Sequence, residues 1–212
     1  MIPDPLGDAA RWLGGGGLLA YATETVWGLG ADATSEAAVA RLRRWKGRGE
    51  SDPLAILVEL AADLPQLGFE PGPDAKKLAA LFWPGPLTLV LPCRGRFAPG
   101  VARGDGAVGV RCSSHPLAAA LARRLRGEGV GPITVTSLNR SGSPPARTRA
   151  EAEPVCGGEP EQPRMLDVKG AEAGGDAVST VVDLAAARPV VLRWGAVADA
   201  ALAPVLADLE GA

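Results

Sequence analysis

The stretch that decides the fold is residues 21–34, which read YATETVWGLGADAT. It follows a glycine run at residues 14–17 and a short apolar run at residues 18–21, an order typical of a turn that leads into a buried strand. After that strand, two threonines flank a glutamate in a turn rich in glycine, and Ser35 is placed to open a helix. Hydroxyls at a strand exit can point at a ligand, and the glycines would let that ligand come close to the backbone. The alternative, for a lone segment of this kind, is an ordinary capped strand-to-helix turn.

Outside this stretch, apolar runs and helical periodicities alternate along the chain, which predicts strands and helices in turn. We expect helices over residues 5–13, 35–45, 74–82 (with Asp74 as the cap), from 115–116 onward and around 202–209, and strands at 53–58, 87–91, 107–111, 132–137, 179–184 and 189–193. Residues 46–52 read as a polar loop, and residues 143–178 as a short helix near 149–155 followed by a long mobile loop. Because only a few residues join the last two strands, we expect them to pair antiparallel.

This alternation predicts an α/β fold, with a twisted mixed β-sheet flanked by helices. The chain has 212 residues, of which 47% are hydrophobic and 22% are charged. These values indicate one globular domain over residues 1–212. The net charge of -2 argues against a protein whose whole surface binds nucleic acid, although a local basic groove stays possible.

The cysteines and the apolar runs bear on the compartment. Cys93, Cys112 and Cys156 are widely scattered, with neither a CxxC pair nor a histidine cluster beside them. A disulfide framework or a zinc site is therefore not expected, and reduced thiols in a cytoplasm fit best. No apolar run is long enough to cross a membrane, and the amino terminus lacks the pattern of a secretory signal, so we expect no membrane partner.

Polar and cationic side chains stand at the ends of several separate predicted strands. They are Thr23, Thr25, Arg111, Ser137, Asn139, Ser179, Thr180 and Arg193, with Lys46 and Arg48 in a neighbouring loop. Hydroxyls, an amide and cations that meet at strand ends predict a crevice for an anionic ligand. Taken singly, each has another explanation: a solvated charge run, a hydrogen-bonded turn, or a structural salt bridge. His115, the only histidine, precedes a proline and is interpreted as a helix cap.

Several well-known catalytic motifs are missing from the sequence. There is no GxxxxGK[ST] phosphate loop and no GxSxG nucleophile elbow, and the Gly28-Leu29-Gly30 run lacks the third glycine of a dinucleotide-binding turn. A Ser-His-Asp triad would depend on His115 alone. Chemistry in this protein is therefore expected to work by positioning and charge neutralisation.

Taken together, the motifs resemble one family, the YrdC-type threonylcarbamoyl-AMP synthases in their single-domain bacterial form. The resemblance covers about residues 8–195 and is carried, in order, by residues 21–30 (YATETVWGLG), 46–48 (KGR), 52–54 (DPL), 83–88 (WPGPLT), 110–111 (VR), 137–142 (SLNRSG), 179–184 (STVVDL) and 192–193 (LR). It implies a YrdC-like fold around a large concave cleft. It also implies a nucleotidyltransferase that makes L-threonylcarbamoyladenylate and pyrophosphate from L-threonine, bicarbonate and ATP, with Mg²⁺ bound alongside ATP.

The resemblance also assigns roles to residues of this chain. It implies that Thr25, Arg111, Val135 and Ser179 bind threonine, that Arg48, Asp52, Ser137, Asn139 and Arg193 bind ATP, and that Lys46 and Arg48 are the catalytic cations, with no protein-held metal. The product would feed the threonylcarbamoyl modification of adenosine 37 in tRNA, so separate tRNA-modification proteins are expected partners, and tRNA itself is a possible one.

Some positions depart from the family pattern, and two other functions stay open. Ala22, Trp27, Leu138, Gly49 and Trp194 replace the usual residues of their motifs, which spares the charged groups but alters the walls of the site. One alternative is the related carbamoyl-adenylate chemistry of hydrogenase maturation. The other is a non-catalytic RNA-binding module.

Overall fold

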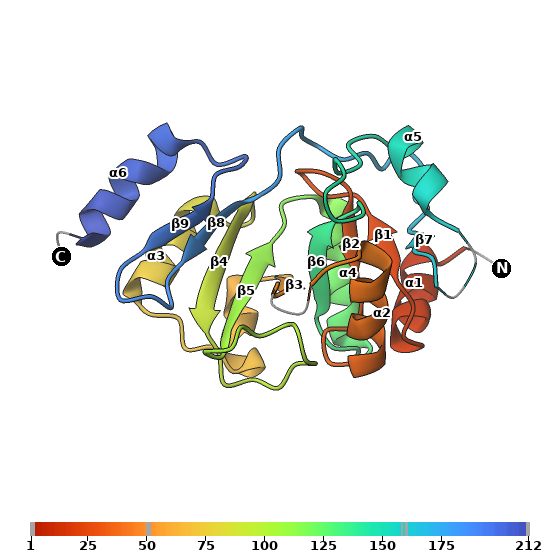
Figure 1. Ribbon diagram of the computed structural model, residues 1–212, viewed down its shortest axis with the longest axis horizontal. Coiled ribbons are helices and arrows are strands. Elements are labelled where there is room, and N and C mark those ends of the chain that lie inside the picture. Colours follow the sequence, from red (N-terminus) through yellow and green to blue (C-terminus); the bar gives the residue numbers. More distant parts are fainter. Residues whose placement is uncertain (1–2, 50–51, 158, 160, 211–212) are drawn as a thin grey trace.

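A single twisted sheet with strands of both orientations organises the molecule (Figure 1). The computed structural model describes residues 3–49, 52–157, 159 and 161–210, and in them the sheet has nine strands in the order β7-β1-β2-β6-β3-β5-β4-β8-β9. The strands are β1 Leu19–Tyr21, β2 Gly28–Gly30, β3 Ala55–Val58, β4 Leu87–Pro92, β5 Ala107–Cys112, β6 Ile133–Ser137, β7 Arg164–Met165, β8 Thr180–Asp183 and β9 Val190–Arg193. Pairing is parallel for β1/β7, β3/β5 and β4/β8 and antiparallel for the other neighbours. The predicted α/β fold with a mixed sheet is confirmed, including the antiparallel β8/β9 pair.

Residues 19–30 form a β-hairpin. Strands β1 and β2 pair antiparallel, with Tyr21 opposite Gly28. The prediction that residues 28–30 form a turn is therefore wrong. These glycines make room for a large side chain, because a Cβ on Gly28 would lie 3.1 Å from the Tyr21 ring and one on Gly30 would lie 3.0 Å from the Thr134 carbonyl oxygen. Gly28 and Gly30 thus serve close packing inside the sheet, and residues 22–27 form the connection that carries the threonines.

Helices begin and end close to the expected positions. The helices are α1 Pro5–Gly14, α2 Glu36–Lys46, α3 Pro73–Phe82, α4 Pro116–Gly127, α5 Arg149–Ala152 and α6 Asp199–Glu210, with short 3₁₀ helices η1 Ala61–Leu67 and η2 Glu153–Val155. Ser35 caps α2 by accepting the Ala38 N–H, and His115 caps α4 by accepting the Leu117 N–H on Nδ1, both as predicted.

Two local expectations about loops and caps need correction. Helix α3 has Gly72 as its cap, so Asp74 lies inside the first turn. The region after α5 and η2 holds strand β7, which pairs parallel with β1, and it is not only the long loop that was expected. A two-residue strand has too little periodicity to be seen in the sequence. The predicted loops at residues 50–51, 158 and 160 lie outside the described residues.

The core is divided between the two faces of the sheet. Leu18 and Ala20 belong to one buried cluster with residues of α2, α3 and α6, whereas Leu19 and Tyr21 belong to another with residues of α1 and α4. This alternation along β1 is what a strand with both faces covered requires. Helices α1 and α6 lie at opposite ends of the molecule (Figure 1). None of the helices in the described ranges has the length and apolar character needed to span a bilayer.

Candidate functional site

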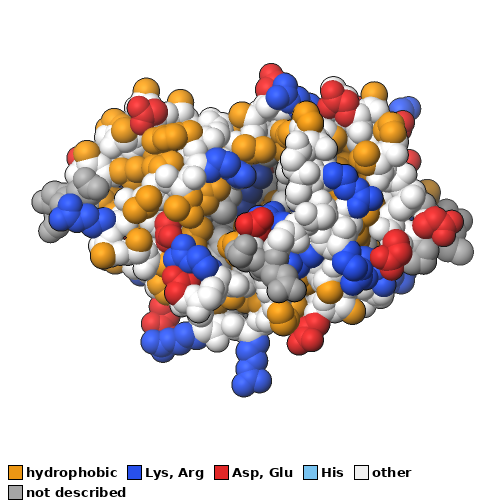
Figure 2. Space-filling model, viewed as in Figure 1, with side chains coloured by type: hydrophobic (Ala, Val, Ile, Leu, Met, Phe, Trp, Pro, Cys, Tyr) orange, Lys and Arg blue, Asp and Glu red, His pale blue; other side chains and the backbone are white. Residues whose placement is uncertain are grey.

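A pocket of about 510 Å³ opens between the two halves of the sheet. Figure 2 shows it as a hollow in the face of the molecule with Lys and Arg side chains inside it. Its walls include the β1–β2 connection, the end of α2, strands β4, β5 and β6, the start of β8 with the two residues before it, and the end of β9. Among the predicted site residues, those that line this pocket are Thr25, Lys46, Arg48, Arg111, Val135, Ser137, Asn139, Ser179 and Arg193.

Asp52 is the exception among the predicted site residues. It is absent from the pocket wall, its side chain is 61% exposed, and its carboxylate lies 3.9 Å from Nε of Arg48. An exposed ion pair of this length contributes little to stability. The structure thus places Asp52 beside a pocket residue and outside the pocket itself.

Lys46 is buried at the end of α2 and does not lie in the polar loop where the sequence put it. It is the last helical residue, and Gly47, with φ of 65°, ends the helix in the left-handed conformation. Its Nζ donates hydrogen bonds to the Ser137 carbonyl oxygen at 2.6 Å, the Asn139 carbonyl oxygen at 2.9 Å and Asn139 Oδ1 at 3.1 Å. Lys46 therefore ties the end of β6 to α2, and only 4% of it is exposed.

The charge on Lys46 is sensitive to pH. Burial, followed by the nearby Arg48 guanidinium, lowers the pKa of Lys46 to about 8. Above that pH the free protein loses the cation, so we expect the affinity of the pocket for an anion to fall as pH rises through about 8. The measurement is a pH series of calorimetric titrations of the free protein with inorganic sulfate, whose charge is constant in this range. A flat profile up to pH 9.5 would contradict this expectation.

Two neighbouring side chains orient the guanidinium of Arg111, the carboxylate of Glu24 and the hydroxyl of Thr25. Its Nη2 donates to Thr25 Oγ1 at 2.7 Å and lies 3.0 Å from Oε1 of Glu24. Glu24 also accepts a hydrogen bond from the Ser113 hydroxyl. Burial would raise the pKa of Glu24, but Arg111 and then Ser113 more than offset this and hold the pKa below its ordinary value. Glu24 is therefore ionised at neutral pH and orients Arg111 from outside the pocket wall.

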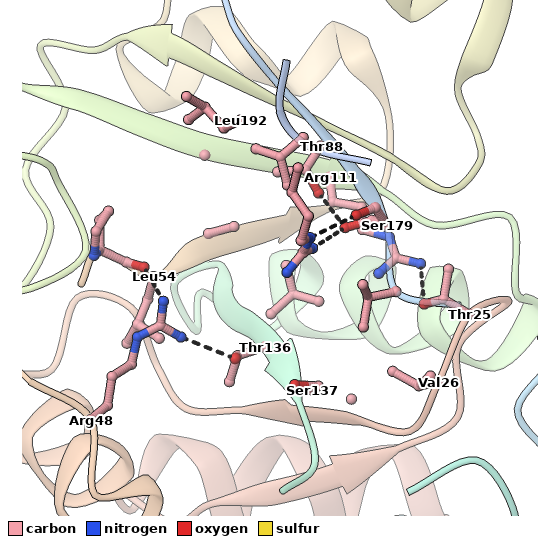
Figure 3. A pocket seen from close by; sticks show the side chains of 18 of the residues that line it. Thr25, Val26, Arg48, Leu54, Thr88, Arg111, Thr136, Ser137, Ser179 and Leu192 are labelled. Carbon is pink, nitrogen blue, oxygen red and sulfur yellow. Dashed lines mark hydrogen bonds between the residues drawn. The ribbon is translucent and has the colours of Figure 1, made fainter. Parts of the chain in front are cut away.

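A second group of hydrogen bonds in the pocket wall centres on Ser179. Arg193 donates from Nε to the Ser179 carbonyl oxygen and from Nη2 to the Ser179 hydroxyl, both at 3.0 Å. The same hydroxyl lies 2.9 Å from the hydroxyl of Thr88 (Figure 3). Ser179 thus connects a cation of β9 with a hydroxyl of β4.

The cations of the pocket repel one another. Burial, then Arg111 and then Arg48, lowers the pKa of Arg193, and burial also lowers the pKa of Arg48. Arg48 donates to Thr136 Oγ1 at 3.3 Å, as Figure 3 shows. Buried cations that destabilise one another are arranged to receive an anion, because a negative ligand relieves both the burial and the repulsion.

Sequence reasoning missed some side chains of this site. Thr88, Thr136 and Arg103 line the pocket, and Glu24 supports it. A signal existed for two of them, since Glu24 stands between the threonines of the first motif and Thr88 ends the WPGPLT run. Arg103 lies in a loop without a motif, and its guanidinium is neutralised by Asp105 and Asp183.

The pocket does not form a metal site of its own in the described ranges. Its lining there contains hydroxyls, carbonyls and cations but neither aspartate nor glutamate, and those ranges hold no cluster of possible metal-ligating side chains. Mg²⁺ bound to a nucleotide takes most of its ligands from phosphate and water. The expected Mg²⁺ would therefore take its ligands from a bound nucleotide and water, and not from carboxylates of this pocket.

Comparison with known proteins agrees with this geometry. A family model for the Sua5/YciO/YrdC domain, which carries the description "Telomere recombination", matches residues 11–195. The chain belongs to this family. It is 41% identical over 186 residues to a threonylcarbamoyl-AMP synthase of Chromohalobacter salexigens, a match that covers 85% of this chain and 93% of that protein. Family membership, which the motif order predicted, is confirmed.

Longer members of the family match as well. The chain is 37% identical to the Bacillus subtilis threonylcarbamoyl-AMP synthase, covering 97% of this chain and 59% of that one. Its structure matches that of Pyrococcus abyssi Sua5 complexed with L-threonine with a TM-score of 0.85 and 32% identity, covering 99% of this chain and 60% of that one. The chain thus spans about three fifths of these two relatives.

Proposed function

We propose that this protein is an L-threonylcarbamoyladenylate synthase, a nucleotidyltransferase that makes threonylcarbamoyl-AMP and pyrophosphate from L-threonine, bicarbonate and ATP. The observation that carries the proposal is that both predicted sets of ligands, apart from Asp52, line one pocket. Arg111 and Ser179 represent the threonine set, and Arg48 and Arg193 represent the ATP set. Relatives that carry the name threonylcarbamoyl-AMP synthase support it, and so does a family member solved with L-threonine.

The reaction needs what this pocket contains. The amine of threonine captures CO₂ from bicarbonate as a carbamate, a carbamate oxygen attacks the α-phosphorus of ATP, and pyrophosphate leaves. Both reactants are anionic, so they must be aligned while their repulsion is offset. Buried cations with fixed hydrogen bonds supply that charge without a nucleophilic side chain.

In this proposal the residues divide as the sequence predicted. Threonine is bound by Thr25, Arg111, Val135 and Ser179, and ATP by Arg48, Ser137, Asn139 and Arg193, with Mg²⁺ carried on the nucleotide. Lys46 acts between the threonine ligands and the ATP ligands, because its ammonium group fixes the backbone between Ser137 and Asn139. Asp52 stays a predicted ATP ligand that acts through Arg48.

The product is an activated acyl-adenylate, so a separate acceptor must consume it. We infer that tRNA-modification proteins take it up for t6A37 formation in the cytoplasm. Direct binding of tRNA remains a prediction. A role in RNA binding alone is disfavoured, since Arg111 and Lys46 are turned inward and buried.

The experiment that tests the proposed function measures pyrophosphate release from ATP with threonine, bicarbonate, both, or neither. We expect release only when both are present, and we expect the product to be identified by its mass as threonylcarbamoyl-AMP. Equal ATP turnover without threonine, or equal efficiency with serine, would overturn the substrate assignment.

A further inference from the structure

Thr88 is a buried polar residue of the pocket to which the proposed function gives no role. It lies on β4, directly opposite Arg111 of β5 and beside Val181 of β8. Its side chain lines the pocket and is only 5% exposed. Within the described ranges, its hydroxyl has one hydrogen-bond partner, Oγ of Ser179 at 2.9 Å. Thr88 therefore lies between the two arginines that the proposal assigns to different substrates.

The direction of the hydrogen bonds around Ser179 follows from their donors. A guanidinium can only donate, so Ser179 Oγ accepts from Arg193 Nη2. The two hydroxyls share one hydrogen bond but carry two protons between them. If Thr88 donates to Ser179, the Ser179 proton is left over, and if Ser179 donates, the Thr88 proton is left over. In both cases the pair keeps one O–H proton for an acceptor outside the pair.

The surroundings specify the kind of acceptor. The free O–H group lies in a pocket lined by Arg111 and Arg193, whose charges favour an anionic oxygen. We propose that Thr88 is a positioning residue of the amino-acid subsite. Through its hydrogen bond with Ser179, Thr88 holds these two hydroxyls so that the pair donates a hydrogen bond to an anionic oxygen of the bound amino acid. This inference rests on the proposed function, because that function supplies an amino acid with a carboxylate or carbamate.

Three variants separate this role from a structural one. Thr88→Val removes the hydroxyl and keeps the shape of the side chain, and Thr88→Ser restores the hydroxyl. The matched control is Thr134→Val, which removes another buried strand hydroxyl. That hydroxyl accepts only the Ala31 N–H in the described ranges, and Thr134 is not part of the pocket wall.

The experiment measures pyrophosphate release as a function of threonine and of ATP, together with calorimetric titration of threonine into each variant. We expect Thr88→Val to raise the KM and Kd for threonine about tenfold, because the pair of hydroxyls is lost and the remaining Ser179 hydroxyl is no longer oriented by Thr88. The KM for ATP should stay within about twofold, and Thr88→Ser should recover most of the threonine affinity. Thr134→Val should leave both KM values at those of the parent protein.

The inference is overturned if Thr88→Val binds threonine like the parent, if Thr88→Ser is as impaired as Thr88→Val, or if the KM for ATP rises equally. These outcomes are distinct from a failure of the proposed function. In that case the parent protein itself would release no pyrophosphate with threonine and bicarbonate, and the inference would fall with it.

Discussion

Replacing Lys46 by alanine is expected to lower turnover about a hundredfold or more, which is the effect of removing a preorganised charge donor from an active site. The variant should also lose about 1–3 kcal/mol of unfolding free energy, because three hydrogen bonds of a buried ammonium group are lost. The Ser137 carbonyl oxygen would keep the Asn139 N–H and Asn139 Oδ1 would keep the Ser137 hydroxyl, so only the Asn139 carbonyl oxygen would lose its one described donor. The measurements are steady-state pyrophosphate release and urea unfolding.

A matched control lies on the same helix. Arg44 is also cationic, but its side chain is 65% exposed and its described ion pair, with Glu161, has a length of 3.7 Å. Arg44→Ala should therefore change neither turnover nor stability measurably. Parental turnover in a folded Lys46→Ala variant would return Lys46 to a purely structural role. A Lys46→Met variant keeps the aliphatic stem, so it separates the loss of packing from the loss of charge.

Much of the fold could be predicted because its signals are local. The helices α1, α2 and α4 have a cap and an apolar face in the sequence, and the long apolar runs of β4 and β5 are unambiguous. Strands β2 and β7 could not be predicted, since their identity depends on tertiary contacts. The GLG run of β2 is a strand because it pairs with β1 and β6, and its glycines leave room for the Tyr21 ring.

The site was predictable in its membership and less so in its detail. Apart from Asp52, the distant residues that the motifs singled out line one pocket, because side chains at the ends of neighbouring strands meet in space. Burial is different, since it depends on packing between elements: Lys46 looked like part of a solvated charge run, yet it is buried under the end of β6. The sequence also gives no sign that Glu24 faces Arg111, a contact between the β1–β2 connection and β5.

The contact between Glu24 and Arg111 decides how Arg111 and Arg193 should be tested. Arg111→Ala is expected to weaken threonine binding by about 2–4 kcal/mol, the cost of losing two charge-assisted hydrogen bonds to a carboxylate. ATP binding should change little. Arg193→Ala should weaken ATP binding mainly, with a smaller effect on threonine because Arg193 also donates to the Ser179 hydroxyl. Calorimetric titration of each variant with each ligand measures both effects.

The single variant Arg111→Ala has a second consequence, a loss of stability, which must be separated from the loss of threonine binding. It leaves the Glu24 carboxylate buried without its cation, a change that destabilises the fold strongly. The double variant Glu24→Gln/Arg111→Ala replaces that charge by a neutral amide, so it should regain stability while threonine binding stays weak. If the double variant binds threonine like the parent, Arg111 is a structural partner of Glu24, and the carboxylate of threonine is held elsewhere. If Arg193→Ala leaves the affinity for ATP unchanged, the division of the pocket into two subsites fails at that residue.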